Sequence, residues 1–230
     1  MNETRSDVAD LLEWSTIEAR GDDASSFLQG QISQDLTQIP ESGAWALLLT
    51  PDSVVLTTCF VTPVLSGFDV VVPAALADEA HTRLKRFLLR TKCALEVKTA
   101  SAGPFTSKKD QIDARWPGVE EFAASLTPHS FGHSFVKSTI SFDKGCFTGQ
   151  ELVGRLDARG SSVPWRMVHV QGPSKESLDA VLKSKGPDGP QGVTSWYSLD
   201  ETVVGLGFAH RTLFAALEGS TPDVIVEEVD

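Results

Sequence analysis

The segment at residues 144–155 concentrates the residue types in this sequence that could do chemistry. It reads KGCFTGQELVGR and places Cys146 two residues after Lys144. A neighbouring cation and a helix N-terminus both favour the thiolate form of a cysteine, which is its nucleophilic and ligand-binding form. The spacing therefore indicates that Cys146 is a reactive or ligand-contacting thiol.

The residues after this cysteine predict the beginning of a helix. Thr148 and Glu151 have the spacing of a capping box, so the helix is expected to begin at Thr148. Gly149 and Gln150 would then lie in its first turn, where free backbone N–H groups can bind an anion or a carbonyl group. Just upstream, Gly145 permits a positive φ angle or the close approach of a ligand.

A structural interpretation of the same residues stays open beside the functional one. A capping box before a short helix occurs in many proteins without any function, and a cysteine at this position is more often packed than reactive. Glu151 and Arg155 are four residues apart and can form an ordinary ion pair on the helix surface. The spacing alone therefore favours a structural role.

Strand-like segments and one amphipathic helix fill the first hundred residues. Runs rich in β-branched and aromatic residues predict successive antiparallel strands at 44–50, 54–62 and 68–72, and further strands are expected at 14–20 and 93–97. A short helix capped by Asp22 or Asp23 should run to Gln29. Apolar residues at helical spacing predict a further helix from about residue 74 to 90. The fold class is therefore predicted to be α+β.

Short strands punctuated by Gly-Pro pairs follow Trp165. They are expected at 167–170, 193–198 and 203–209, and they predict a small β-barrel-like module. A helical turn is expected at 212–217, and the acidic tail after Pro222 is either disordered or an added edge strand. We therefore divide the chain into an α+β region at 1–160, built of two interleaved subdomains, and a barrel-like module at 161–230.

Charge and composition exclude several classes of function. The 230 residues carry a net charge of −11, from 20 basic and 31 acidic residues, which argues against nucleic acid as the main partner. No apolar run approaches the ~20 residues that span a membrane. The first residues form neither an apolar nor an Arg-rich leader, so a cytoplasmic location is expected. The cationic run from Arg83 to Lys92 is predicted to be a solvated helix face rather than a binding site.

Cysteine and histidine spacing gives no sign of a metal site. Cys59, Cys93 and Cys146 are odd in number and show no CxxC pair, which argues against a disulfide framework and a zinc knuckle. His129 and His133 are four residues apart, but a proline precedes them and a glycine interrupts the helix that a metal pair would need. We therefore expect reduced thiols and no bound metal.

The segment at 144–155 resembles the signature of YgfZ-type proteins, K-G-C-aromatic-x-G-Q-E-x-x-x-R. All eight defined positions match, at Lys144, Gly145, Cys146, Phe147, Gly149, Gln150, Glu151 and Arg155. Residues 21–35 are similar to the opening motif of this family, and residues 192–195 and 204–207 are similar to its closing β-module. The resemblance extends over most of residues 11–217.

This resemblance implies a fold like that of the glycine-cleavage T-protein (GcvT), with subdomains around a central cavity that holds tetrahydrofolate. It implies a tetrahydrofolate-binding protein that assists assembly or repair of iron–sulfur clusters in client enzymes. Cys146 would be the functional thiol, and the other signature residues, Lys144, Gly145, Phe147, Gly149, Gln150, Glu151 and Arg155, would shape the folate site around it. Gln29 and Gln31 would line the cavity, although hydrogen bonding at a helix end explains them equally well.

Two other functions compete with this interpretation. The T-protein itself is an aminomethyltransferase with an aspartate on a strand after a Gly-Gly turn. Here Leu56 and Thr57 stand near that position, which argues against efficient aminomethyl transfer and against a conventional enzyme. A non-catalytic interaction module is the other alternative. The sequence also departs from the YgfZ pattern at Ser53, where the family has the glycine of a Pro-x-Gly-basic turn.

Overall fold

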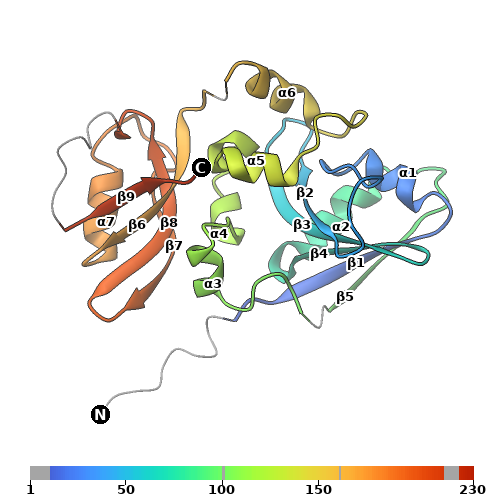
Figure 1. Ribbon diagram of the computed structural model, residues 1–230, viewed down its shortest axis with the longest axis horizontal. Helices are drawn as coiled ribbons and strands as arrows, with labels where there is room; N and C mark the ends of the chain where they lie inside the picture. The colour runs from blue at the N-terminus through green and yellow to red at the C-terminus, as the bar shows by residue number, and fades with distance from the viewer. Residues whose placement is uncertain (1–10, 100–101, 161, 215–222) are drawn as a thin grey trace, which may run out of the picture.

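The computed structural model describes residues 11–99, 102–160, 162–214 and 223–230. Two antiparallel sheets stand on either side of a layer of short helices (Figure 1). The first sheet and the helical layer come from the part of the chain before the second sheet. Among the described residues, no helix is both long enough and apolar enough to cross a membrane.

The first sheet has five strands in the order β2-β3-β4-β1-β5. They are β1 (Trp14–Arg20), β2 (Ala44–Leu49), β3 (Val55–Val64), β4 (Gly67–Pro73) and β5 (Ala94–Thr99). Successive side chains of a strand point to opposite faces, and β2 is apolar on both. Ala46 and Leu48 belong to the core on one face, whereas Leu47 and Leu49 belong to the core on the other. The sheet is therefore covered on both sides.

Helices α1 (Ala24–Gln29) and α2 (Ala77–Lys85) cover the face of the first sheet that carries Leu48. A single 3₁₀ turn, η1 (Ala74–Leu76), leads from Pro73 at the end of β4 into α2. Leu28 of α1 and Ala80 and Leu84 of α2 are fully buried in this core. These side chains give the two helices their packing face.

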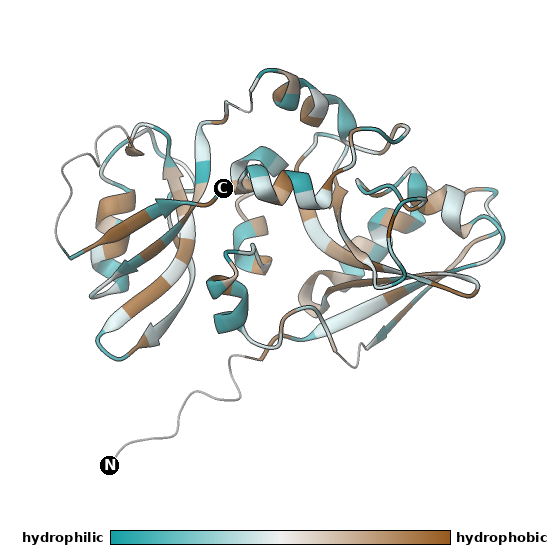
Figure 2. Ribbon diagram, viewed as in Figure 1, coloured by the Kyte–Doolittle hydropathy of each residue, from teal (hydrophilic) through white to brown (hydrophobic). Residues whose placement is uncertain are grey.

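The helical layer between the sheets consists of short segments. They are α3 (Lys108–Asp113), α4 (Val119–Phe122), η2 (Pro128–Phe131) and α5 (His133–Thr139), followed by α6 (Gln150–Ala158). The colouring of Figure 2 shows α3 as strongly hydrophilic, whereas the strands on either side are largely apolar. α3 contributes Gln111 and Ile112 to the interior, whereas all four residues of η2 are buried.

A row of aromatic side chains crosses this layer from one sheet to the other. Trp45 of β2 lies 4.4 Å from Trp116, measured between ring centroids, and Trp116 lies 5.1 Å from Phe135 of α5. Phe135 then contacts Phe131 at 5.3 Å, and Phe131 contacts Phe208 of the second sheet at 5.7 Å. Such contacts add to the burial of apolar area. The row makes the two sheets share one central core.

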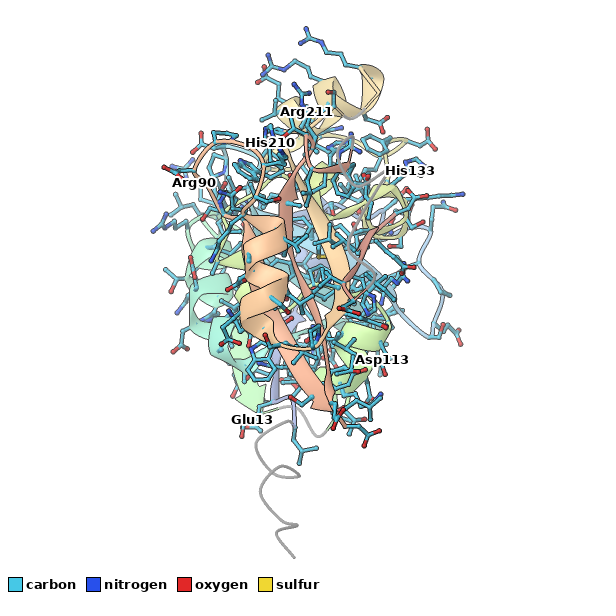
Figure 3. The ribbon with its side chains drawn as sticks, turned by 90° about the vertical axis from the view of Figure 1, so that its left-hand side faces the viewer. Glu13, Arg90, Asp113, His133, His210 and Arg211 are labelled. Atoms are coloured by element: carbon cyan, nitrogen blue, oxygen red, sulfur yellow. The ribbon has the colours of Figure 1, made fainter. Side chains whose placement is uncertain are left out.

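The second sheet has four strands in the order β7-β8-β6-β9. They are β6 (Trp165–Gly172), β7 (Gly192–Leu199), β8 (Thr202–His210) and β9 (Ile225–Glu228). Helix α7 (Lys175–Leu182) covers the outer face through Leu178 and Leu182, and it stands in front of the sheet in Figure 3. The helical layer covers the inner face.

The observed elements confirm the α+β class and most of the predicted strands, but they correct two predictions. The helix predicted over 74–90 ends at Lys85. The described strands of the second sheet form an open sheet, so the β-barrel is not confirmed. Helices cover both faces of that sheet, so it buries its apolar faces without closing. A central cavity is not confirmed, and the division at residue 160 stays a prediction.

The acidic tail adds an edge strand, as one of the two sequence interpretations anticipated. β9 pairs antiparallel with β6, from Val168 opposite Glu228 to Gln171 opposite Ile225. The helical turn predicted at 212–217 extends beyond residue 214 and so lies partly outside the described residues.

Glu121 is a buried carboxylate that links the helical layer to the second sheet. It is 1% exposed on α4, and it accepts hydrogen bonds from the hydroxyls of Thr194 and Ser195 on β7. It also accepts one from the backbone N–H of Gly118 at 2.7 Å. Burial raises the pKa of Glu121, and these three donors only partly oppose the shift. The carboxyl group therefore holds its proton more tightly in the folded chain than in the unfolded one.

This raised pKa predicts a pH-dependent contribution to stability. As pH rises above 4.5, the unfolded chain loses the Glu121 proton first, so the folded wild type loses stability relative to a Glu121→Gln variant. Glutamine resembles the protonated acid and does not titrate. Urea unfolding of both proteins across pH 4 to 8 measures the difference, and Glu120→Gln is the control. A wild-type-minus-variant difference that stays constant with pH would contradict the prediction.

Candidate functional site

Lys144 fastens the signature segment to the loop that follows α1. Its ammonium group donates hydrogen bonds to the backbone carbonyl oxygens of Gln29 at 2.7 Å, Ile32 at 2.8 Å and Gln34 at 2.8 Å. An ammonium group has three N–H donors, so all three are used. The two segments with the family resemblance, 21–35 and 144–155, are therefore joined in space at this residue.

The environment of Lys144 is that of a structural residue. The residue is 8% exposed, and its ammonium lies 5.2 Å from the centroid of the Phe147 ring. Burial lowers the pKa of Lys144 from 10.5 to about 8, and the nearby Asp35 carboxylate opposes this shift. The geometry thus gives Lys144 a role in holding two loops together. The contact with a ligand that the sequence suggested for it stays a prediction.

The turn at Gly149 packs against the turn between β2 and β3. Gly149 has a φ angle of 82°, and a Cβ atom there would lie 2.6 Å from the carbonyl oxygen of Thr50. On the other side, the Ser53 hydroxyl donates a hydrogen bond to the carbonyl oxygen of Gly149 at 2.6 Å. Both the left-handed backbone and the close contact require glycine at position 149.

Ser53 shows how the chain accommodates its departure from the family pattern. Its φ angle is 66°, a left-handed conformation that glycine adopts without strain. Ser53 is buried, and its hydroxyl bond to Gly149 offsets part of the strain. The turn at residues 50–54 therefore holds a left-handed residue at position 53 without a glycine.

The helix after the signature cysteine does not begin as predicted. α6 begins at Gln150 with Gly149 as its N-cap, and no side chain caps it. The expected capping box at Thr148 is therefore wrong, because the backbone of Thr148 donates instead to the carbonyl oxygen of Gly30 at 3.2 Å. The side chain of Gln150 turns back and accepts from the backbone N–H of Phe147 at 3.3 Å.

Cys146 and Gly145 lie on the exposed side of this turn. Cys146 is exposed, Cys93 is half-buried and Cys59 is buried, and none of the three forms a disulfide. Burial raises the pKa of Cys59 to about 12, which leaves that thiol protonated. A Cβ atom at Gly145 would meet nothing within 4 Å. The signature therefore presents its cysteine to solvent.

The remaining signature residues divide into a buried anchor and an exposed pair. Phe147 is buried in the core between the sheets. Glu151 and Arg155 lie on the exposed surface of α6, with their side chains 3.5 Å apart. An exposed i, i+4 pair of this kind contributes little to stability. Their predicted part in a ligand site stays a prediction.

Gln29 and Gln31 make intramolecular contacts. The Gln29 amide donates to the Asp35 carboxylate at 2.9 Å and accepts from the backbone N–H of Leu36 at 2.9 Å. The side-chain oxygen of Gln31 accepts from Arg83 Nη1 at 2.9 Å. These bonds agree with the alternative of local hydrogen bonding, and the predicted place of both residues at the cavity stays a prediction.

Arg83 is a residue of this region that the sequence interpretation missed. The charge pattern predicts a solvated helix face here, yet Arg83 is 7% exposed and its Nε donates to the carbonyl oxygen of Leu49 at 3.2 Å. Burial lowers its pKa. Arg83 lies three residues after the buried Ala80 and so on the packing face of α2, and this spacing is the signal in the sequence that indicates its burial.

A cleft lies beside the same β2–β3 turn, between α2 and α4. Its volume is about 340 Å³, and we call it the α2–α4 cleft. Leu76 and Glu79 form one wall and Val119, Phe122 and Ala123 the other. Thr50, Val54, Val55, Leu56 and Ser125 complete its lining. Because Thr50 also contacts Gly149, the β2–β3 turn links the signature turn to this cleft.

His129 is buried without a hydrogen-bond partner. Its ring Nε2 lies 4.0 Å from the Asp157 carboxylate on α6, and neither ring nitrogen has a partner among the described residues. Burial lowers its pKa, so the ring is neutral near pH 7. Within the part of the chain that the structure describes, no three His, Cys, Asp or Glu side chains are grouped to hold a metal ion.

Comparison with known proteins shows the fold. No protein-family model matches the sequence, and no curated protein matches it. Among solved structures, the chain is similar to the glycine cleavage system aminomethyltransferase T from Bartonella henselae, with a TM-score of 0.58 and 13% sequence identity. The likeness covers 94% of this chain and 80% of that one. The T-protein-like fold is therefore confirmed.

The three bonds of Lys144 predict a large loss of stability when they are removed. Lys144→Met leaves three buried carbonyl groups without their donor, which should lower the free energy of unfolding by about 3 kcal/mol. Urea unfolding measures the loss. Lys137→Met, at an exposed lysine of α5, is the control and should change stability by less than about 0.5 kcal/mol. Equal effects of the two substitutions would argue against the structural role of Lys144.

Two glycines of the signature segment should respond to alanine in opposite ways. Gly149→Ala should lower the free energy of unfolding by about 2 kcal/mol or more, because of the φ angle and the Thr50 contact. Gly154→Ala, inside α6 with nothing within 4 Å of its Cβ position, should raise it by about 0.5–1 kcal/mol. Thermal unfolding of the two variants checks the sign. A stabilising Gly149→Ala would show that the turn is not as described.

Proposed function

We propose that this protein binds a reduced folate, tetrahydrofolate or a derivative of it, in the α2–α4 cleft, and that it presents Cys146 to iron–sulfur client enzymes whose clusters it helps to assemble or repair. The observation that carries the proposal is the arrangement of the signature. Its buried members fix the segment to the chain, and its cysteine is left exposed. The proposed location is the cytoplasm.

The lining of the α2–α4 cleft suits a flat, largely apolar ring system. Val54, Leu56, Leu76 and Phe122 supply apolar surface, and Thr50 and Ser125 supply polar groups at the edge. Small-molecule sites are clefts of about 300–1,000 Å³ with mainly apolar walls and few polar groups. The residues present therefore fit the proposed ligand, whose chemistry would be that of a one-carbon carrier.

The side chains at the beginning of β3 argue for folate binding rather than aminomethyl transfer. Leu56, which stands near the position of the T-protein's aspartate, lines the cleft with an apolar side chain. A positioned carboxylate contributes about 100-fold or more to a proton-transfer step. The β3 residues in the lining, Val55 and Leu56, offer none, so we propose binding without efficient turnover.

A folate-dependent one-carbon transferase is the second candidate, and one observation favours it. Glu79 of α2 lies in the wall of the cleft. A carboxylate at this place could transfer a proton, which the apolar side chain of Leu56 cannot do. Steady turnover of an aminomethyl donor by the wild type, and its loss in Glu79→Gln, would support the transferase.

The exposed thiol is suited to contact with a client rather than to holding a cluster. Iron–sulfur clusters are commonly held by four cysteine thiolates. Only Cys146 of the three cysteines is exposed, whereas Cys59 is buried with its pKa raised to about 12. A cluster would therefore remain on the client enzyme, with Cys146 reaching it from outside.

Calorimetric titration with tetrahydrofolate under reducing conditions tests the binding proposal. We expect a dissociation constant in the micromolar range for the wild type and for Cys146→Ser, because the thiol is not part of the cleft. Ala123→Trp, at the C-cap of α4, should fill the cleft and abolish binding. Ala114→Trp, at the C-cap of α3, is the matched control and should bind as the wild type does.

Each outcome of this titration leads to a different conclusion. Binding that Ala123→Trp does not weaken would place the ligand elsewhere, and no binding at all would leave an interaction module with a T-protein-like fold. Once binding is established, iron–sulfur enzyme activities are compared in cells that carry only the wild type or only Cys146→Ser. Equal activities would remove the thiol from the proposal.

A further inference from the structure

Two loops meet at the end of the first sheet that is remote from the second sheet. One is the turn at residues 64–67 between β3 and β4, and the other is the connection at 86–93 between α2 and β5 (Figure 1). Gly21 links them, because its N–H donates to the carbonyl oxygen of Ser66 at 3.1 Å and its Cα lies against the carbonyl of Lys92. The two loops therefore adjoin at Gly21, and we call their exposed residues the sheet-end surface. Phe87, which stacks on Arg83 near Leu49, lies at the end of the 86–93 connection that is farther from Leu65.

Large apolar side chains are exposed on this surface. Leu65 is 107% exposed and Leu89 is 85% exposed, and Phe87 and Val64 are more than a third exposed. Single exposed apolar residues are common on proteins, but a group of them on adjoining loops marks an interaction site. The sheet-end surface contains four of the nine exposed large apolar residues among the described part of the chain.

The charge of this surface is opposite to that of the whole protein. Lys85, Arg86, Arg90 and Lys92 lie within eight residues, and no acidic residue occurs between Arg83 and Cys93, although the chain carries a net charge of −11. All four are exposed. Among the described residues, these four cations form one ion pair, between Lys92 and Asp22 at 3.8 Å. A surface with these charges attracts an acidic partner.

Phe87 is held in place before any partner arrives. The guanidinium carbon of Arg83 lies 4.6 Å from the centroid of the Phe87 ring. Arg83 is itself fixed by its bonds to Leu49 and Gln31. A preorganised aromatic residue loses little conformational entropy on binding, and interfaces gain much of their affinity from such anchors.

We propose that the sheet-end surface docks an acidic, amphipathic segment of a partner protein. Apolar side chains of the segment would contact Leu65, Phe87 and Leu89, and its carboxylates would pair with Arg86 and Arg90. Charge complementarity selects this occupant over a second copy of the chain, whose net charge is also negative. The proposal goes beyond folate binding and does not depend on it.

A fluorescent acidic peptide tests the proposal. The probe is a helical peptide with a leucine face and glutamates elsewhere, and a second peptide replaces each leucine with serine. We expect fluorescence anisotropy to show micromolar, salt-sensitive binding of the first peptide and at least tenfold weaker binding of the second. Arg86→Glu/Arg90→Glu should weaken binding of the first peptide at least tenfold, and Leu65→Ser/Leu89→Ser about tenfold.

A matched control makes the same change in net charge elsewhere. Lys137→Glu/Lys185→Glu alters two exposed lysines and should bind within about twofold of the wild type. Lys137 belongs to α5, whose first residue, His133, appears on the opposite side from Arg90 in Figure 3. Circular dichroism confirms that each variant is folded.

Four results would overturn the proposal. They are no binding of the leucine peptide at millimolar concentration, equal binding of the two peptides, equal weakening by the control variant, and tighter binding to anionic phospholipid vesicles than to the peptide. Concentration-dependent dimerisation that Leu65→Ser/Leu89→Ser abolishes would assign the surface to a second copy instead. Retained folate binding in Arg86→Glu/Arg90→Glu would show that the two sites act separately.

Discussion

The candidate site depends on one buried ammonium group. Lys144 donates to three backbone carbonyls in a loop more than 100 residues earlier in the chain, and these bonds bring the two family-like segments together. A buried charge is costly unless its donors are satisfied, and here each of the three has an acceptor. The position of Cys146, two residues later, follows from this anchor. Within the signature, Lys144 and Phe147 are buried and hold the segment in place, whereas Cys146, Glu151 and Arg155 are exposed.

Buried polar and aromatic contacts also join the two sheets and the helical layer between them. The row from Trp45 to Phe208 gives both sheets one core, and Glu121 connects α4 to β7 through hydroxyl donors. The α2–α4 cleft lies within this region, so its walls belong to elements that are fixed from several directions. A cleft with such walls keeps its shape when a ligand binds, which favours affinity over adaptability.

Local patterns predicted the strands of this fold well, because alternation and β-branching are properties of a few consecutive residues. They failed where a distant contact decides the conformation. Gly149 is the N-cap of α6 in place of Thr148 because its backbone packs against Thr50 of the β2–β3 turn. Arg83 is buried because Leu49 and Gln31 accept hydrogen bonds from its guanidinium group. The short helices α3 to α5 have too few residues for a periodic pattern. The exposure of Cys146 likewise depends on how its segment is anchored, and no spacing rule contains that information.

The large sequence separation between Lys144 and its three acceptors affects how the chain folds during synthesis. All five strands of the first sheet are complete by Thr99, yet the carbonyls of Gln29, Ile32 and Gln34 gain their donor only when residue 144 has been synthesised. Native contacts between residues so far apart in sequence slow folding, because a long loop must close first. The loop after α1 therefore gains its last donor only after all five strands of the first sheet have been made, and that donor comes from the segment that carries the exposed thiol.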